Sequence, residues 1–355
     1  MSNVANFEIN YTQILNEKAE VCQDLPSFTN DPNALIDMYK AMVLTRVFDK
    51  KAVALQRTGK LGTYPSSLGQ EAISVAVGSV MQPEDVLVPY YREYGAQFIR
   101  GVTMKEILLY WGGDERGMDY QGPQHDFPIS VPIASQGPHA VGIAYAMKLR
   151  KEKRVAVVFF GDGATSKGDF YESVNAAGVW NLPLIFIVNN NQWAISIRRE
   201  NQTNCETIAQ KAFAGGIDGE QVDGNDPIAM RAVFEKAVDK ARSGQGATVI
   251  EALSYRLCDH TTADDATRYR DDAEVKAAWE KEPVVRLRQH LTNIGDWDDD
   301  KEQAHLEACS KQVEEQVNTY LDTPAQAPET MFDYMFETLP HDLALQRQYL
   351  VNRGK

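Results

Sequence analysis

The sequence predicts an α/β fold, a doubly wound parallel sheet with helices on both faces. Residues 154–160 and 184–188 are apolar runs rich in branched side chains, which are typical of strands covered on both sides. Residues 168–179 lie between these runs and have the composition of a helix. A strand, a helix and a strand at this spacing form a parallel crossover unit, so we expect a parallel sheet.

Ahead of this unit, the spacing of apolar residues separates helices from loops. Leu35, Met38, Met42 and later apolar residues recur at mostly three- and four-residue steps, as on a helix buried on one side. A stretch rich in glycine, proline and serine follows, which indicates a loop. The elements expected here are a helix (31–57), a loop (59–69), a helix (71–81), a strand (85–90), a helix (104–111) and a loop (112–136).

Behind the unit, helix and strand alternate once more. Asp226 precedes Pro227, and an aspartate N-cap followed by proline at the first helical position predicts a helix over 227–243. The apolar residues 247–253 predict the next strand.

We expect the whole chain, residues 1–355, to form one domain, because it contains no internal repeat or low-complexity tract. Residues of about 1–34 are expected to be an N-terminal extension. The charged residues of about 271–355 are expected to form a helical C-terminal segment at the periphery, which covers the sheet or a partner.

The composition disfavours several classes of partner. A formal net charge of −14 opposes binding to nucleic acid and to anionic membranes, so we expect neither. No run of about 18 apolar residues is present, so no membrane span is expected. The four cysteines lack C-x-x-C spacing, and residues 1–20 resemble no targeting sequence. These features predict a cytoplasmic protein without structural zinc or disulfide bonds.

Polar residues follow both central strands at the point where each is expected to end. Gly161-Asp162-Gly163-Ala164 follows the first strand and Asn189-Asn190-Asn191 the second. Open parallel sheets bind ligands at the carboxyl ends of their strands. A carboxylate and an amide oxygen suit Mg²⁺, which takes further oxygens from phosphates and water. Because glycines let phosphate approach the backbone closely, a magnesium diphosphate is the natural ligand.

The glycine-rich turn taken alone has other interpretations. Gly-Asp-Gly is equally compatible with a tight turn that binds nothing. A dinucleotide site is disfavoured, because Gly161, Gly163 and Gly168 depart from G-x-G-x-x-G spacing and no acid ends the next strand. A nucleoside-triphosphate loop is disfavoured because no Gly-Lys-Ser/Thr follows at the required distance.

Several motifs together resemble the alpha chains of thiamine-diphosphate-dependent 2-oxo acid dehydrogenases. The central motif is Gly161-Asp-Gly-Ala-Thr-Ser-Lys-Gly-Asp-Phe-Tyr-Glu172, followed by Asn190-Asn191-Gln-Trp-Ala-Ile-Ser196. The others, in matching order, are Gly69-Gln70-Glu71-Ala72, Tyr91-Arg92, Val222-Asp223-Gly224-Asn225-Asp226, Tyr255-Arg256 and Tyr269-Arg270. The likeness extends from about residue 35 to the end. It implies the thiamine-diphosphate-binding fold and thiamine diphosphate as cofactor. The sequence resembles the pyruvate dehydrogenase type most, with the branched-chain type close behind.

The resemblance also implies a set of ligands. Mg²⁺ would be held by the Asp162 carboxylate, the Asn191 amide oxygen and the backbone carbonyl of Trp193. Gly163 and Ala164 would offer backbone N–H groups to the diphosphate. The other cofactor-binding residues implied are Tyr91, Arg92, Val131, Ile133 and His260.

His260 is also the catalytic residue that the resemblance implies. It follows the last predicted strand and matches a loop histidine that contacts the cofactor and helps transfer the acyl group to lipoamide. A lone histidine in a polar loop is otherwise simply solvated. Arg92 matches a diphosphate contact, for which a guanidinium fork is suited. Next to Glu93, an arginine also suits a surface ion pair.

Residues 130–136 resemble the segment beneath the thiazolium ring of the cofactor. Ile133 would be the apolar wedge that bends the cofactor. In some relatives this segment also binds K⁺, and the residues that match that site are Ser130, Pro132, Ser135 and Gln136. The alternative is an ordinary loop before a helix that starts near Pro138.

The implied reaction is the oxidative decarboxylation of pyruvate with reductive acetylation of lipoyl groups. In heterotetrameric relatives the cofactor-activating glutamate belongs to a beta chain. The implied partners are therefore a beta subunit, two with two alpha chains, and a lipoyl acyltransferase core. Animal pyruvate-type relatives carry a histidine at the position of Pro65, and Thr63 occupies a position often filled by phenylalanine near the substrate. The enzymes of 3-methyl-2-oxobutanoate (branched-chain) and of acetoin therefore stay as alternatives. A noncatalytic binding or scaffold protein is the alternative of another class.

Overall fold

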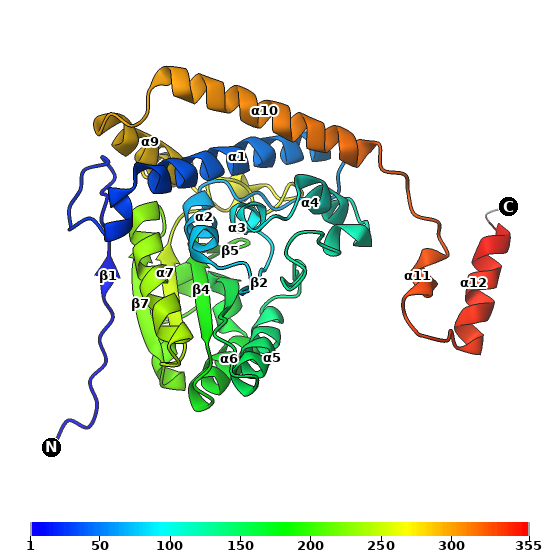
Figure 1. The fold of residues 1–355 in the computed structure, drawn as a ribbon, viewed down its shortest axis with the longest axis horizontal. Coiled ribbons are helices and arrows are strands. Elements are labelled where there is room, and N and C mark those ends of the chain that lie inside the picture. The colour runs from blue at the N-terminus through cyan, green and yellow to red at the C-terminus, as the bar shows by residue number, and fades with distance from the viewer. Residues whose placement is uncertain (1, 354–355) are drawn as a thin grey trace.

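The computed structural model describes residues 2–353 and contains the predicted parallel sheet (Figure 1). Six strands lie in the order β1-β7-β8-β4-β3-β2, and every neighbouring pair is parallel. Strands β5 and β6 form a separate antiparallel pair. The strands are β1 (Tyr11–Thr12), β2 (Val86–Val88), β3 (Ala156–Gly161), β4 (Leu184–Asn190), β5 (Trp193–Ala194), β6 (Ile197–Arg198), β7 (Asp218–Asp223) and β8 (Thr248–Leu253).

Helices cover both faces of the sheet, so the doubly wound prediction is confirmed. On one face α1, α2, α7 and α9 enclose Phe159 and Ile187, and on the other α5 and α6 enclose Phe160 and Phe186. Neighbouring residues of a strand thus enter opposite cores, which explains why these strands are apolar throughout. These helices are α1 (Pro32–Arg57), α2 (Glu71–Val80), α5 (Gln136–Leu149), α6 (Gly168–Val179), α7 (Pro227–Arg242) and α9 (Pro283–Asn293).

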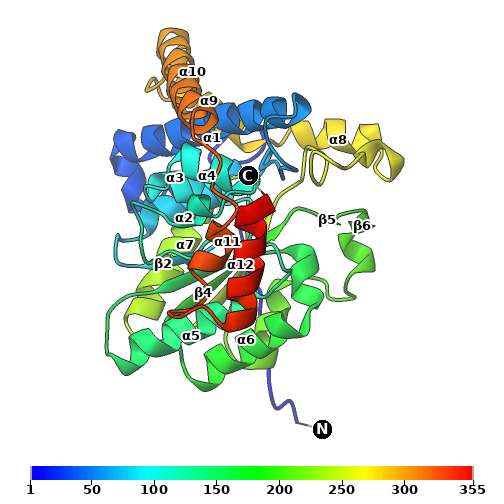
Figure 2. The same ribbon diagram turned by 90° about the vertical axis from the view of Figure 1, so that its right-hand side faces the viewer.

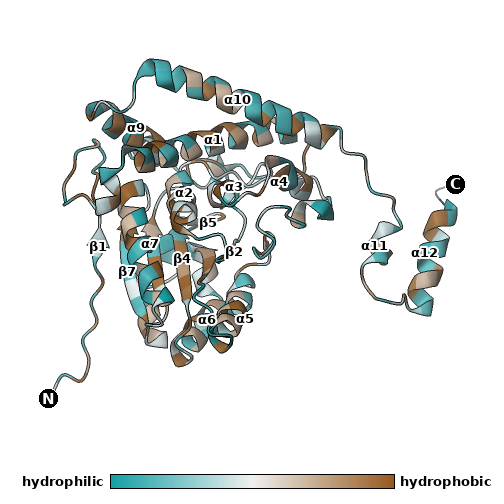
Figure 3. Ribbon diagram, viewed as in Figure 1, coloured by the Kyte–Doolittle hydropathy of each residue, from teal (hydrophilic) through white to brown (hydrophobic). Residues whose placement is uncertain are grey.

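The C-terminal segment is helical, and beyond α9 it covers other helices rather than the sheet. α10 packs along α1 and α4, and α11 and α12 extend away from the rest of the molecule (Figure 1). In Figure 2, which faces that side, α11 and α12 lie in front of the other elements. Only three residues of α10 are buried, which agrees with its largely hydrophilic colouring in Figure 3. The remaining helices are α3 (Tyr94–Ile99), α4 (Met104–Trp111), α8 (Asp272–Trp279), α10 (Asp299–Leu321), α11 (Thr330–Asp333) and α12 (His341–Arg353).

The structure contains elements that the sequence pattern did not predict. β7 has the sequence Asp-Gly-Glu-Gln-Val-Asp, whose polar residues conceal its place inside the sheet. Part of the expected N-terminal extension pairs with it as β1. α5 begins at Gln136, slightly earlier than the expected start near Pro138. Within residues 2–353, none of the helices combines the length and the apolar character that a membrane crossing requires.

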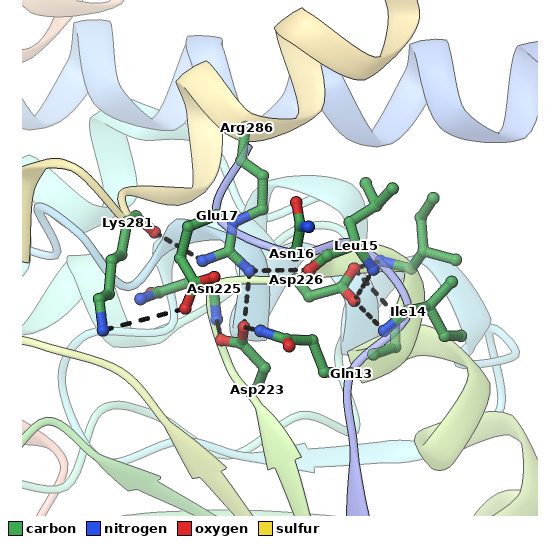
Figure 4. A network of polar contacts seen from close by, with 12 residues as sticks. Gln13, Ile14, Leu15, Asn16, Glu17, Asp223, Asn225, Asp226, Lys281 and Arg286 are labelled. Atoms are coloured by element: carbon green, nitrogen blue, oxygen red, sulfur yellow. Dashed lines mark hydrogen bonds and ion pairs between the residues drawn. The ribbon is translucent and has the colours of Figure 1, made fainter. Parts of the chain in front are cut away.

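Asp226 ties the N-terminal segment to the sheet (Figure 4). Its Oδ1 accepts from the N–H groups of Ile228 and Ala229, so the predicted N-cap of α7 is confirmed. Its Oδ2 accepts from the N–H groups of Ile14 and Leu15, both at 2.7 Å. Burial raises the pKa of this carboxyl, and the hydrogen bonds from the N–H groups of Leu15, Ile14 and Ala229 partly oppose the rise.

We expect Asp226→Ala to lower the free energy of unfolding by about 3 kcal/mol. The cap contributes about 1 kcal/mol. The N–H groups of residues 14 and 15 would lose their acceptor, and each such loss costs at least about 1 kcal/mol. Asp298 caps α10 by accepting from Lys301 N–H, is exposed, and otherwise forms only a long surface ion pair with the same lysine, so Asp298→Ala is the matched control, with a loss of about 1 kcal/mol. Chemical denaturation measures both. Equal losses would show that the second pair of hydrogen bonds contributes nothing.

Candidate active site at the carboxyl ends of β3 and β4

A cavity of about 230 Å³ opens where β3 and β4 end. The strand register pairs Gly161 with Asn189, so the turns that follow the two strands lie side by side. The predicted site residues that line the cavity are Tyr91, Arg92, Ser130, Ile133, Gln136, Asp162, Gly163, Ala164, Asn191, Trp193 and His260. Val131, Pro132 and Ser135 are not among its lining residues, and the Val131 side chain is exposed to solvent.

Asp162 supplies a buried carboxylate at this position. Burial raises its pKa to about 6, although a hydrogen bond from Gln202 and the charge of Arg256 oppose the rise. Gln202 Nε2 donates to Asp162 Oδ2 over 2.7 Å. A carboxylate whose charge is so poorly compensated is disposed to bind a cation.

Gly163 allows the backbone to pack tightly beside Asp162. A Cβ atom placed on Gly163 would lie 2.6 Å from Cβ of Ala194, closer than atoms normally approach. The turn after β3 therefore requires glycine at this position, and its backbone remains accessible from the cavity.

Asn191 faces the same cavity from the end of β4. Its side chain is buried, and its Oδ1 accepts from the backbone N–H of Trp193 over 3.2 Å. An amide oxygen has two lone pairs, so one stays available to a ligand.

His260 lies between two guanidinium groups. Its Nδ1 is 3.2 Å from Arg92 Nη2 and 3.4 Å from Arg256 Nη1. Arginine can only donate, so Nδ1 must accept and the ring proton belongs on Nε2. Burial and the two positive charges lower the pKa of His260 to about 3. The imidazole is thus a neutral donor through Nε2–H near pH 7.

Arg92 is buried, so the interpretation as a surface ion pair is wrong. It donates to the carbonyl oxygens of Ser66 and His260, the latter over 2.7 Å. Glu93 instead accepts from the N–H of Tyr90, and burial raises its pKa to about 8. The Arg92 guanidinium, for which residues 2–353 provide no ion pair, therefore brings a positive charge to the cavity wall, where an anion would stabilise it.

Residues 130–136 form one wall of the cavity. The hydroxyls of Ser130 and Ser135 are 2.9 Å apart, and Ser135 Oγ also donates to the carbonyl of Pro132. Gln136 donates to the carbonyl of Phe159 and is buried. Ile133 lines the cavity with nearly half of its side chain exposed.

Two residues important for the geometry were not predicted as site residues. Arg256 is fully buried and donates to the carbonyl of Ile195 and to His260. Gln70 contacts the side chains of Asn189 and Asn191. Both belong to motifs that carried the family resemblance, Tyr255-Arg256 and Gly69-Gln70-Glu71-Ala72, but local sequence gives neither a reason to reach this cavity.

Comparison with known proteins shows the family of the chain. The family model of the dehydrogenase E1 component matches residues 39–329. The chain belongs to this dehydrogenase E1 family. Among its curated relatives, the pyruvate dehydrogenase E1 component subunit alpha of Bacillus subtilis (strain 168) is 38% identical, over 94% of this chain and 90% of the relative. Proteins of the same name from Staphylococcus aureus (strain Mu50 / ATCC 700699) and Bacillus cereus are 37% and 38% identical, each over 97% of this chain and 92% of the relative.

We expect His260 in this E1 chain to stay neutral from pH 5 to pH 8, because its pKa is about 3. NMR of ring-labelled histidine measures this, with the signal assigned by its loss in His260→Gln. Arg92→Met removes one of the two positive charges and is expected to raise the pKa of His260. A His260 signal that titrates near pH 6.5 in the unaltered protein would contradict the burial and charge described above.

Proposed function

We propose that this E1 chain acts in the thiamine-diphosphate-dependent oxidative decarboxylation of pyruvate, with acetyl transfer to lipoyl groups. The observation that carries the proposal is the buried pair Asp162 and Asn191 beside a glycine turn at two adjacent strand ends. Pyruvate is proposed as the substrate because the relatives named above are pyruvate dehydrogenase subunits.

The residues of the cavity suit a magnesium diphosphate. We infer that Asp162, Asn191 Oδ1 and the carbonyl of Trp193 hold Mg²⁺, which prefers oxygen ligands and takes the rest from diphosphate and water. The pKa of about 6 for Asp162 supports this, since a cation would relieve the cost of its buried charge. Backbone N–H groups of Gly163 and Ala164 would bind the diphosphate.

The positively charged wall suits the same ligand. Arg92 and Tyr91 would contact the diphosphate, with Ile133 against the rings of the cofactor. Thiamine diphosphate, when bound, supplies the electron sink for decarboxylation. His260 would donate a hydrogen bond through Nε2–H to the cofactor and to the acyl group during its transfer, without changing its own charge.

A partner subunit would complete the site. The relatives are named as alpha subunits, and the apolar side chains of Ile133 and Ile195 at the cavity are about half exposed. We infer a beta subunit in a two-alpha, two-beta assembly that serves a lipoyl acyltransferase core. The clustered oxygens of Ser130, Pro132 and Ser135, with Gln136 nearby, support K⁺ binding beneath the cofactor.

Asp162→Ala tests the metal assignment. In the assembly with the beta subunit, we expect kcat/KM for pyruvate to fall at least about a hundredfold, because a metal contributes several kcal/mol and 1.4 kcal/mol corresponds to about tenfold. The exposed-site variant Asp298→Ala is expected to keep the unaltered rate. Retention of activity in Asp162→Ala would refute the assignment.

A panel of pyruvate, 3-methyl-2-oxobutanoate and acetoin tests which substrate the assembly prefers. A preference for either of the last two would refute pyruvate as the substrate.

The raised pKa of Asp162 predicts a pH dependence. Protons compete with Mg²⁺ for this carboxylate, so the affinity for Mg²⁺ should be constant above about pH 7. Below the pKa of about 6, it should fall about tenfold per pH unit. Calorimetric titration at saturating thiamine diphosphate measures this. We expect Asp162→Asn to bind Mg²⁺ weakly, with an affinity that does not change with pH. If this variant kept the pH profile of the unaltered protein, the titrating group would be another one.

A further inference from the structure

Gln70 joins two asparagines at the carboxyl end of β4, Asn189 within the strand and Asn191 just after it. Its Oε1 accepts from Asn189 Nδ2 and from Asn191 Nδ2, both at 2.9 Å. Gln70 lies just before α2, more than a hundred positions away in the chain, and all three side chains are at least 96% buried. The loss of one of these contacts therefore leaves a buried amide group without its protein partner, which costs free energy.

The orientation of each amide in this cluster follows from a single backbone group. The N–H of Trp193 can only donate, so the Asn191 atom next to it must be Oδ1. Nδ2 of Asn191 then points to Gln70, whose facing atom must be the acceptor Oε1. Asn189 must in turn present Nδ2 to Gln70, and Ser254 donates to the remaining Asn189 Oδ1 over 2.7 Å.

We propose that Gln70 is a positioning residue for the metal site. It holds the Asn191 amide so that nitrogen faces the interior and Oδ1 faces the cavity, where a cation needs an oxygen. This inference rests on the proposed function, because it takes Asn191 as a metal ligand. Groups that orient a metal ligand typically change metal affinity by about 10- to 100-fold when they are replaced.

The side-chain nitrogen of Gln70 makes it possible to compare substitutions that keep or remove the acceptor oxygen. Its Nε2 is buried and has no hydrogen-bond partner among the described residues. Gln70→Glu therefore replaces an unused donor by oxygen and keeps the acceptor that faces both asparagines. Gln70→Met removes the acceptor at nearly constant volume. Gln70→Asn keeps an amide but withdraws it by one methylene group.

Gln97 offers a matched control. It is a buried glutamine of α3 that donates to Tyr120 Oη over 3.1 Å and lies outside the cavity lining. Gln97→Met makes the same chemical change as Gln70→Met, but it leaves the asparagines untouched. If the loss of any buried amide weakened Mg²⁺ binding, both variants would show a raised dissociation constant.

The test measures the dissociation constant of Mg²⁺ by calorimetry in the metal-free assembly with the beta subunit, at saturating thiamine diphosphate. Thermal unfolding of each variant reports folding separately. We expect Gln70→Met to raise the dissociation constant at least about tenfold. Gln70→Glu and Gln97→Met should stay within about threefold of the unaltered protein, because the buried acid at position 70 is favoured in its neutral form and keeps the acceptor oxygen.

The outcomes separate this inference from the proposed function. If Asp162→Ala weakens Mg²⁺ binding but folded Gln70→Met binds as well as the unaltered protein, the positioning role is wrong and the metal site stands. If Asp162→Ala leaves the dissociation constant unchanged, the metal site itself is wrong. Should Gln70→Met fail to fold, Gln70→Asn decides, with a weaker affinity supporting the role and an unaltered affinity overturning it.

Discussion

The parallel register between β3 and β4 is the constraint on which the candidate site depends. Because Gly161 pairs with Asn189, the residues that follow both strands emerge at one edge of the sheet, and Asp162 meets Asn191 there. The register is itself fixed by burial, since the apolar residues of both strands enter a helical layer on each face. The packing that stabilises the fold therefore also sets the spacing of the polar pair.

Burial then sets the chemistry of the polar groups at that edge. Desolvation raises the pKa of Asp162 and lowers the pKa of His260. It therefore favours a cation beside Asp162 and disfavours a proton on the imidazole of His260. Arg92 and Arg256 accentuate the difference with two positive charges on one side of the cavity. The result is a cavity that suits a ligand carrying both a divalent cation and a multiply charged anion.

Local sequence predicted the elements whose pattern is strong and missed those whose stability comes from distant partners. The runs of β3 and β4 and the Asp226 cap of α7 each carry their own signal, and the structure agrees with them. β7 is polar and lies in the sheet because β1 and β8 flank it, which no window of sequence reveals. The site shows the same division: the turn residues Asp162 and Gly163 were predictable from their strand, whereas Gln70 reaches the cavity only through tertiary packing.

We propose that a metal binds between the ends of β3 and β4. The most direct measurement is anomalous diffraction from crystals of the assembly with the beta subunit, grown with thiamine diphosphate and with Mn²⁺ in place of Mg²⁺. We predict one strong peak per alpha chain, about 2.1 Å from the Asp162 carboxylate, Asn191 Oδ1 and the Trp193 carbonyl. A peak that avoids Asp162 and Asn191 would contradict the account.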